Sequence, residues 1–142
     1  MITFGIEAWY GASQTSRNRI FVLQKKALRA INNLPYNSHT HQSFCNMRIL
    51  KLNECYRLNI LVHLFKFRKT SPVSLNSDVH SHNTRGRNQV LVPFYKKSRS
   101  QSSWLYQAIL EWNRLPGSVK SNINFEKFKK EVLKYLFESY DQ

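Results

Sequence analysis

The sequence predicts a mainly α-helical fold, a small helical bundle with a loop-rich middle and at most one short β-hairpin or strand. Apolar residues recur at helical spacing in several stretches, whereas residues 70–97 lack this periodicity. The 142 residues, 42% of them hydrophobic, are enough for one domain with a core. We therefore expect a single helical domain over residues 1–142, with helices at 1–69, a basic loop at 70–99 and a C-terminal helical pair at 100–142.

The first long helix is expected from Arg17 to Leu34. Pro35 ends it, because the residue before a proline is pushed out of the α region. Apolar residues at three- and four-residue steps would form one inward stripe: Ile20, Leu23, Ala27, Ala30, Ile31 and Leu34. The basic side chains Lys25, Lys26 and Arg29 would then lie on the opposite, outward face.

A short helical turn is expected at residues 40–47, and a second long helix at residues 54–69 with Asn53 as its N-cap. Apolar residues cover almost the whole circumference of this second helix: Leu58, Ile60, Leu61, Val62, Leu64, Phe65 and Phe67. A helix that is apolar all round is the central one of a bundle.

The middle segment has one strand-like run, Val90-Leu91-Val92, before Pro93. A third helix follows, capped by Ser100 or Ser102 and ended by Leu115-Pro116-Gly117. Its inward side would hold Trp104, Leu105, Ala108, Trp112 and Leu115. The last helix is expected from Asn124, and it would bury Phe125, Phe128, Val132, Tyr135 and Leu136.

The chain is strongly basic, with 22 Lys and Arg against 8 Asp and Glu and a formal charge of +14. Such a surface attracts polyanions, so nucleic acid is the expected partner, ahead of the alternative of an anionic membrane surface. Residues 17–69 hold eleven basic residues and one acid, and residues 85–99 hold five and none. The candidate nucleic-acid contacts are Lys25, Lys26, Arg29, Arg85, Arg87, Lys96, Lys97 and Arg99.

Two simpler interpretations of these features stay open. The charges could belong to ordinary solvated helix faces. Phe94 and Tyr95, which lie among the loop cations, could stack on bases or merely pin the loop to the core.

Catalysis by this chain alone is not expected. Enzymes that use two metal ions need clustered carboxylates, and the eight acids here include no adjacent or closely spaced aspartate pair. Glu126 and Glu131 would pair with neighbouring lysines on a solvated helix face. The cysteines and several histidines do not have zinc-site spacing: His39, His41, Cys45, Cys55, His80 and His82. We expect no metal and no cofactor.

The location expected from the sequence is intracellular, either nuclear or cytoplasmic, without a membrane partner. The N-terminus does not read as a signal peptide, and no stretch approaches the roughly 20 apolar residues that span a bilayer. Cys45 and Cys55 are too few for a disulfide framework and would be buried thiols.

Several short motifs follow one another along nearly the whole chain. They are FGIEAW at 4–9 with LQKKALR at 23–29, ILKL at 49–52, HSHNTR at 80–85, WNRLP at 112–116, and FK at 128–129 with LKYL at 133–136. In this order they resemble the C-terminal region of reverse transcriptases from non-long-terminal-repeat retrotransposons, in particular the jockey-like group. The order of the motifs along the chain carries the resemblance.

The resemblance implies that residues 1–69 are thumb-like helices, which in that family grip primer–template behind the active site of an RNA-directed DNA polymerase. The partners would be RNA or an RNA–DNA hybrid, held through the backbone, and the polymerase palm upstream. This sequence lacks the aspartate pair of the palm and the Cys- and His-rich knuckle that ends some related elements. Met1 falls within what is continuous polymerase in the family, so we expect a fragment with an accessory role.

Two other functions fit the sequence. The chain could be a non-catalytic helical remnant with no specific nucleic-acid role, or a protein-interaction adaptor that docks through an exposed Trp9, Tyr10 or Tyr140. A salt titration of nucleic-acid binding distinguishes these two functions from the nucleic-acid-binding one, because binding through phosphates weakens steeply with salt.

Overall fold

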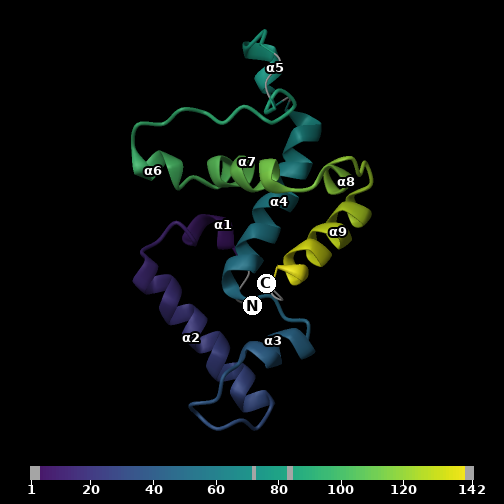
Figure 1. Cartoon of the computed structure of the whole chain (residues 1–142). Helices are drawn as coiled ribbons and strands as arrows, with labels where there is room; N and C mark the ends of the chain where they lie inside the picture. Colours follow the sequence, from purple (N-terminus) through teal and green to yellow (C-terminus); the bar gives the residue numbers. More distant parts are fainter. Residues whose placement is uncertain (1–3, 72, 83–84, 140–142) are drawn as a thin grey trace.

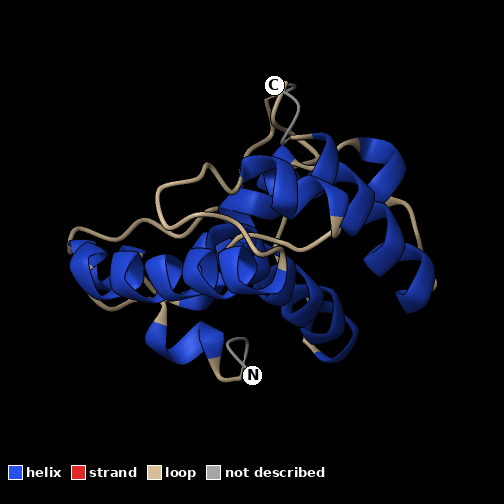
Figure 2. Cartoon of the chain, turned by 90° about the horizontal axis from the view of Figure 1, so that it is seen from below, coloured by secondary structure: helices blue, strands red, loops and turns tan. Residues whose placement is uncertain are grey.

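The computed structural model describes residues 4–71, 73–82 and 85–139, which form helices joined by loops (Figure 2). The helices are α1 (Ile6–Trp9), α2 (Gln14–Ile31), α3 (His41–Asn46), α4 (Leu52–Thr70), α5 (Asn76–Val79), α6 (Ser98–Gln101), α7 (Trp104–Arg114), α8 (Gly117–Lys120) and α9 (Phe125–Glu138). The predicted mainly helical fold is confirmed. The short helices α1, α5, α6 and α8 were not expected, since four residues are too few to show a helical period.

Helix α4 is the centre of the molecule, as its apolar circumference predicts. Figure 1 shows it running through the middle, with α7 crossing it, α9 beside it and α2 at the periphery. Its buried residues are Leu52, Tyr56, Ile60, Leu61, Leu64 and Phe65. The N-cap is Lys51 rather than the predicted Asn53. The helix begins earlier because Leu52, only 3% exposed, already packs in the core.

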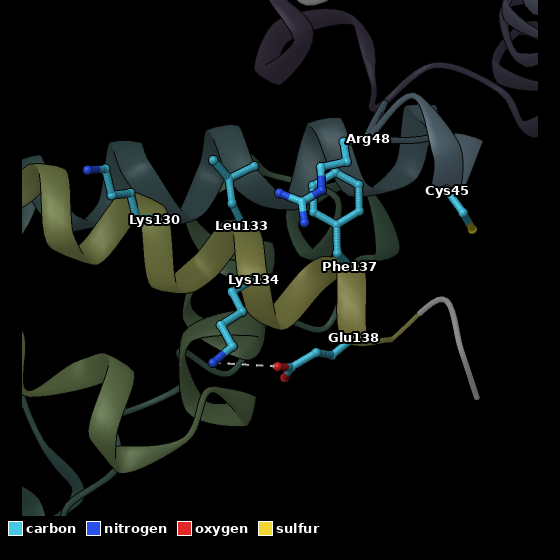
Figure 3. Close-up of a pocket in the computed structure, with 7 residues that line it drawn as sticks. All are labelled: Cys45, Arg48, Lys130, Leu133, Lys134, Phe137 and Glu138. Carbon is cyan, nitrogen blue, oxygen red and sulfur yellow. Dashed lines mark ion pairs between the residues drawn. The ribbon is translucent and has the colours of Figure 1, made fainter. Parts of the chain in front are cut away.

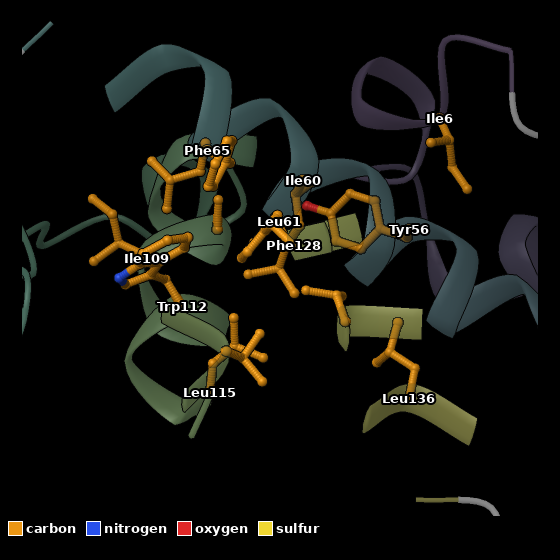
Figure 4. Close-up of a cluster of buried hydrophobic side chains, with 14 of the residues drawn as sticks. Ile6, Tyr56, Ile60, Leu61, Phe65, Ile109, Trp112, Leu115, Phe128 and Leu136 are labelled. Atoms are coloured by element: carbon orange, nitrogen blue, oxygen red, sulfur yellow. The ribbon is translucent and has the colours of Figure 1, made fainter. Parts of the chain in front are cut away.

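One hydrophobic core joins α1, α4, α7, α8 and α9 (Figure 4). Phe128 of α9 lies at its centre, 4.4 Å from the ring of Phe65 and 5.5 Å from the ring of Trp112, measured between ring centroids. The N-terminal and C-terminal helices therefore do not form separate bundles, because α4 packs against both α7 and α9. Residues from Ile6 to Leu136 share this core.

The ends of α7 and α9 are set by side-chain caps. Asn124 caps α9 as predicted, with its Oδ1 accepting hydrogen bonds from the amides of Glu126 and Lys127 at 2.9 and 3.1 Å. Helix α7 is capped by Ser103, whose Oγ accepts from the amide of Tyr106. The predicted caps Ser100 and Ser102 belong instead to α6 and its C-terminal end. Leu115-Pro116 ends α7 as predicted.

Helix α2 packs through a different face from the predicted stripe. Its inward positions are Ile20, Phe21, Gln24 and Leu28. Leu28 is 2% exposed, and Gln24 Nε2 donates to the carbonyl of Leu50 at 2.8 Å. Of the predicted stripe on α2, Ile20 does pack against the core, but the rest is wrong, because Leu23 is 60% and Ile31 is 63% exposed.

The physical reason is that α2 has apolar residues on two sides. Phe21 stacks against Phe44 of α3, with 6.1 Å between ring centroids, and this contact turns one side inward. Periodicity alone cannot say which of two apolar faces meets a partner. The polar residue on the inward face, Gln24, also hides the stripe that is used.

The middle segment is held by Val90 rather than by a strand. The Val90 amide donates to Asn113 Oδ1 at 3.0 Å, and Asn113 Nδ2 donates to the Val90 carbonyl at 2.9 Å. The strand-like run at residues 90–92 forms, within the described residues, an isolated antiparallel bridge to Leu75. Val90 is 2% exposed, so it anchors the segment in the core.

Candidate nucleic-acid interface

A polar groove lies between α2 and the N-terminal half of α4, and extends to α7 at one end and α3 at the other. Three hollows of about 390, 430 and 380 Å³ form it, and neighbours share lining residues. Tyr10, Arg17 and Asn53 line both of the first two hollows, and Phe21 and Lys51 line both of the last two. We call this the basic groove. Its charged lining residues are Arg17, Lys25, Lys51, Glu54, Arg57, Glu111 and Arg114.

At the α7 end of the basic groove, one carboxylate holds two arginines. Glu111 Oε2 accepts from Arg57 Nε and Glu111 Oε1 accepts from Arg114 Nη1, each at 2.7 Å. The Glu111 side chain is 11% exposed, and the ion pairs compensate its burial. The carboxylate fixes guanidinium groups from α4 and α7 at one place.

Two stacked tyrosines line the same hollow as this carboxylate. The rings of Tyr10 and Tyr56 lie 3.9 Å apart at an interplanar angle of 10°, and Arg17 Cζ lies 4.8 Å from the Tyr10 centroid. The Tyr10 hydroxyl donates to Asn53 Oδ1 at 2.6 Å. Burial raises the pKa of Tyr10 and raises the pKa of Tyr56 to about 12. Both phenols are therefore neutral at pH 7 and add no negative charge to the groove.

The predicted contacts on α2 are only partly outward. Lys26 is exposed, but Lys25 and Arg29 are half-buried. Lys25 Nζ lies 4.5 Å from the Phe21 ring centroid and lines the groove, while Arg29 Nε donates to the carbonyl of Ser38 at 3.0 Å. The expectation that all three lie opposite the packed face is wrong, because the packed face is rotated toward Lys25.

The predicted contacts in the middle segment are all exposed: Arg85, Arg87, Lys96, Lys97 and Arg99. Arg85 and Arg87 lie beside α5, where the amide of Ser77 bonds the carbonyl of Arg87 at 3.0 Å. Figure 1 places α5 at the opposite end of α4 from α2, so these arginines and the α2 cations do not share one groove. Lys96, Lys97 and Arg99 lie in and before α6.

The aromatic residues of the loop differ from each other. Phe94 is 85% exposed, so its ring does not pin the loop to the core. The Tyr95 ring lies 5.7 Å from the Tyr106 ring and holds the loop against α7. The loop motif at residues 80–85 includes positions 83 and 84, which lie outside the described residues.

The sequence missed the groove residues that α4 and α7 provide. Arg57, Lys51 and Arg114 lie in or beside helices that also form the core, and only the tertiary packing brings them together. Arg17 counted toward the basic excess of residues 17–69 but was not among the candidate contacts. The excess of positive charge over residues 17–69 was the signal that pointed to this region.

A second, larger hollow of about 600 Å³ lies between α9 and the turn after α3 (Figure 3). Leu133 and Phe137 give it an apolar wall, and its cations are Arg48, Lys130 and Lys134. It shares no lining residue with the basic groove. Lys134 is partly neutralised by Glu138, at 3.9 Å between Nζ and Oε1.

No protein-family model, curated protein or solved structure matches this chain. Within the described ranges, no three His, Cys, Asp or Glu side chains are grouped so that they could hold a metal ion. Cys45 Sγ lies 3.7 Å from His41 Nε2, and both cysteines are half-buried free thiols. Of the described helices, none is both long and apolar enough to cross a membrane.

Proposed function

We propose that this chain binds nucleic acid through the phosphate backbone, with the basic groove as the contact surface. In keeping with its resemblance to the C-terminal region of a retrotransposon reverse transcriptase, the role is accessory. The chain grips RNA or an RNA–DNA hybrid, while a palm domain would supply the catalytic aspartates of RNA-directed DNA synthesis.

The observation that carries the proposal is the charge of the groove. Five Lys and Arg line it against two acids, and one of these acids, Glu111, is already shared by two arginines. Arginine forks bind phosphate oxygens in pairs, and lysines add point charges. The groove lies on a chain of net charge +14, whose long-range field attracts the same ligand.

Helix α2 supports the proposal further, because it contains no acid at all. Its 18 residues hold Arg17, Arg19, Lys25, Lys26 and Arg29. No carboxylate on this helix competes with a phosphate for these cations. A helix whose charges only served solubility would more commonly mix the two signs.

The adaptor function has less support. Trp9 and Tyr10 are half-buried, since Trp9 Nε1 donates to the carbonyl of Phe4 at 3.0 Å and Tyr10 stacks on Tyr56. Neither ring is available as the exposed anchor that docking on a protein would need. Tyr140, the third residue considered, lies outside the described residues.

The proposal is tested by measuring the affinity of the chain for an RNA–DNA hybrid with 5′-hydroxyl ends over a range of salt concentrations. We expect log affinity to fall with log salt with a slope of about −3 to −5, because each phosphate contact contributes about −0.9. Hybrids of different sequence should bind about equally, since phosphate contacts do not read bases. A slope near zero, or no binding at low salt, would reject the proposal.

A further inference from the structure

The hollow at the α7 end of the basic groove differs from the rest of the groove in its charge balance. Three guanidinium groups, from Arg17, Arg57 and Arg114, line it together with a single carboxylate, Glu111. Its other lining residues are the neutral Tyr10, Asn53, Tyr56 and Gln107. This hollow therefore has an excess of two positive charges.

Glu111 cannot neutralise that excess, but it does orient the arginines. Its two oxygens accept hydrogen bonds from Arg57 Nε and Arg114 Nη1, each at 2.7 Å. The hydrogen bonds of the described residues leave the other N–H groups of Arg57 and Arg114 available to a ligand. Two forks from different helices, fixed by one shared carboxylate, are preorganised donors for an anion.

We infer that the hollow bounded by Arg17, Arg57 and Arg114 binds a phosphate monoester, the group carried by a free nucleotide and by the phosphorylated end of a nucleic acid. A monoester has a charge of about −1.5 to −2 at pH 7, which matches the excess of two, whereas a backbone phosphodiester has about −1. The volume of about 390 Å³ accommodates such a group. For a nucleic-acid end the inference rests on the proposed function; for a free nucleotide it does not.

The ligand is recognised by its phosphate rather than by a base. The faces of Tyr10 that could receive a base are occupied by Tyr56 at 3.9 Å and by Arg17 at 4.8 Å. Base stacking on this ring pair is therefore blocked, so the identity of the base should have little effect.

The experiment compares two oligonucleotides of the same sequence, one with a 5′-phosphate and one with a 5′-hydroxyl, and adds adenosine 5′-monophosphate as a free nucleotide. The chain is tested as wild type, as Arg114→Gln and as Arg99→Gln. Arg114 is 66% exposed, so its removal should leave the fold intact. Arg99 is exposed, lies outside the hollow and gives the matched loss of one charge.

We expect the 5′-phosphate to improve binding about tenfold, an advantage that Arg114→Gln loses and Arg99→Gln keeps. Nucleotide binding that Arg114→Gln abolishes, without a preference between the oligonucleotides, supports the same site with a free nucleotide as its ligand. The inference fails if neither probe shows a phosphate effect, or if the effect survives Arg114→Gln. Salt-dependent binding of the 5′-hydroxyl oligonucleotide tests the proposed function separately.

Discussion

The indole ring of Trp112 lies where α4, α7 and α9 meet. It is 3% exposed, its centroid is 5.5 Å from that of Phe128, and Arg68 Cζ lies 4.4 Å from its centroid. Desolvation beside the core lowers the pKa of Arg68. One side chain of α7 thus contacts two other helices that share the core, α4 and α9.

Replacing Trp112 with Ala should lower the free energy of unfolding by about 3–5 kcal/mol, because a large buried ring is lost and a cavity is left. Denaturant unfolding measures this loss. Ile123→Ala is the control, since Ile123 is 86% exposed and its loss should change stability by less than about 0.5 kcal/mol. A cost below about 1 kcal/mol for Trp112→Ala would contradict the burial.

Cys55 gives the protein a pH dependence at alkaline pH. Burial, with a smaller contribution from Glu54, raises the pKa of its thiol from the ordinary 9.0 to about 11. The folded state therefore binds the proton more tightly than the unfolded state. The stability contributed by this tighter proton binding is complete below pH 9 and is lost as pH rises through 11.

A Cys55→Ala variant should therefore lose less unfolding free energy than the wild type when the pH is raised from 9 to 11. Tyr56, with a pKa of about 12, acts in the same direction in both proteins and leaves part of the dependence in the variant. Chemical denaturation at a series of pH values measures the difference. Identical pH profiles for the two proteins would show that the Cys55 thiol is not perturbed.

At the scale of the helix, substitutions on the two apolar faces of α2 show which face is packed. Leu28→Ala should cost about 2–5 kcal/mol, because Leu28 is 2% exposed. Leu23→Ala is the matched control on the same helix, and at 60% exposure it should cost less than about 0.5 kcal/mol. Thermal or denaturant unfolding measures the stability that each variant loses. A larger loss for Leu23→Ala than for Leu28→Ala would mean that the face predicted from the sequence is the packed one.

The middle segment depends on one side chain of α7. Asn113→Ala removes both hydrogen bonds to Val90 and leaves its buried amide and carbonyl unpaired, at a cost of about 1–3 kcal/mol. Asn113→Asp keeps an acceptor for the Val90 amide, so it should be intermediate. Hydrogen exchange at the Val90 amide should be fastest in Asn113→Ala, and unchanged exchange there would exclude this anchor.

The elements differ in how far the sequence could predict them. The central position of α4 and the Asn124 cap of α9 follow from local patterns, namely apolar residues all round and an Asn before a helical stripe. The packed face of α2 does not follow from a local pattern, because it is set by the contact with Phe44 of α3, which is distant in sequence. The Ser103 cap was not predicted because the serines before it, Ser100 and Ser102, belong to the additional short helix α6 and its C-cap.

At the scale of the whole molecule, the charge was predictable and its arrangement was not. The excess at residues 17–69 is visible in the sequence, yet the groove also needs Arg114 from α7, brought to Arg57 by Glu111. Arg85 and Arg87 show the converse, since they are basic and exposed but lie at the far end of α4. Composition predicts a polyanionic partner, and tertiary packing determines which surface carries the charge.

The most direct measurement of the central claim compares two double variants with the same loss of charge. Lys25→Gln with Arg114→Gln removes two cations of the basic groove, and Lys127→Gln with Lys129→Gln removes two exposed cations of α9 outside it. In salt titrations with a 5′-hydroxyl RNA–DNA hybrid, the groove pair should reduce the slope by about two and the α9 pair should change it little. Equal reductions for the two pairs would contradict the account, because the charge would then act as a diffuse field and the groove would not be the contact surface.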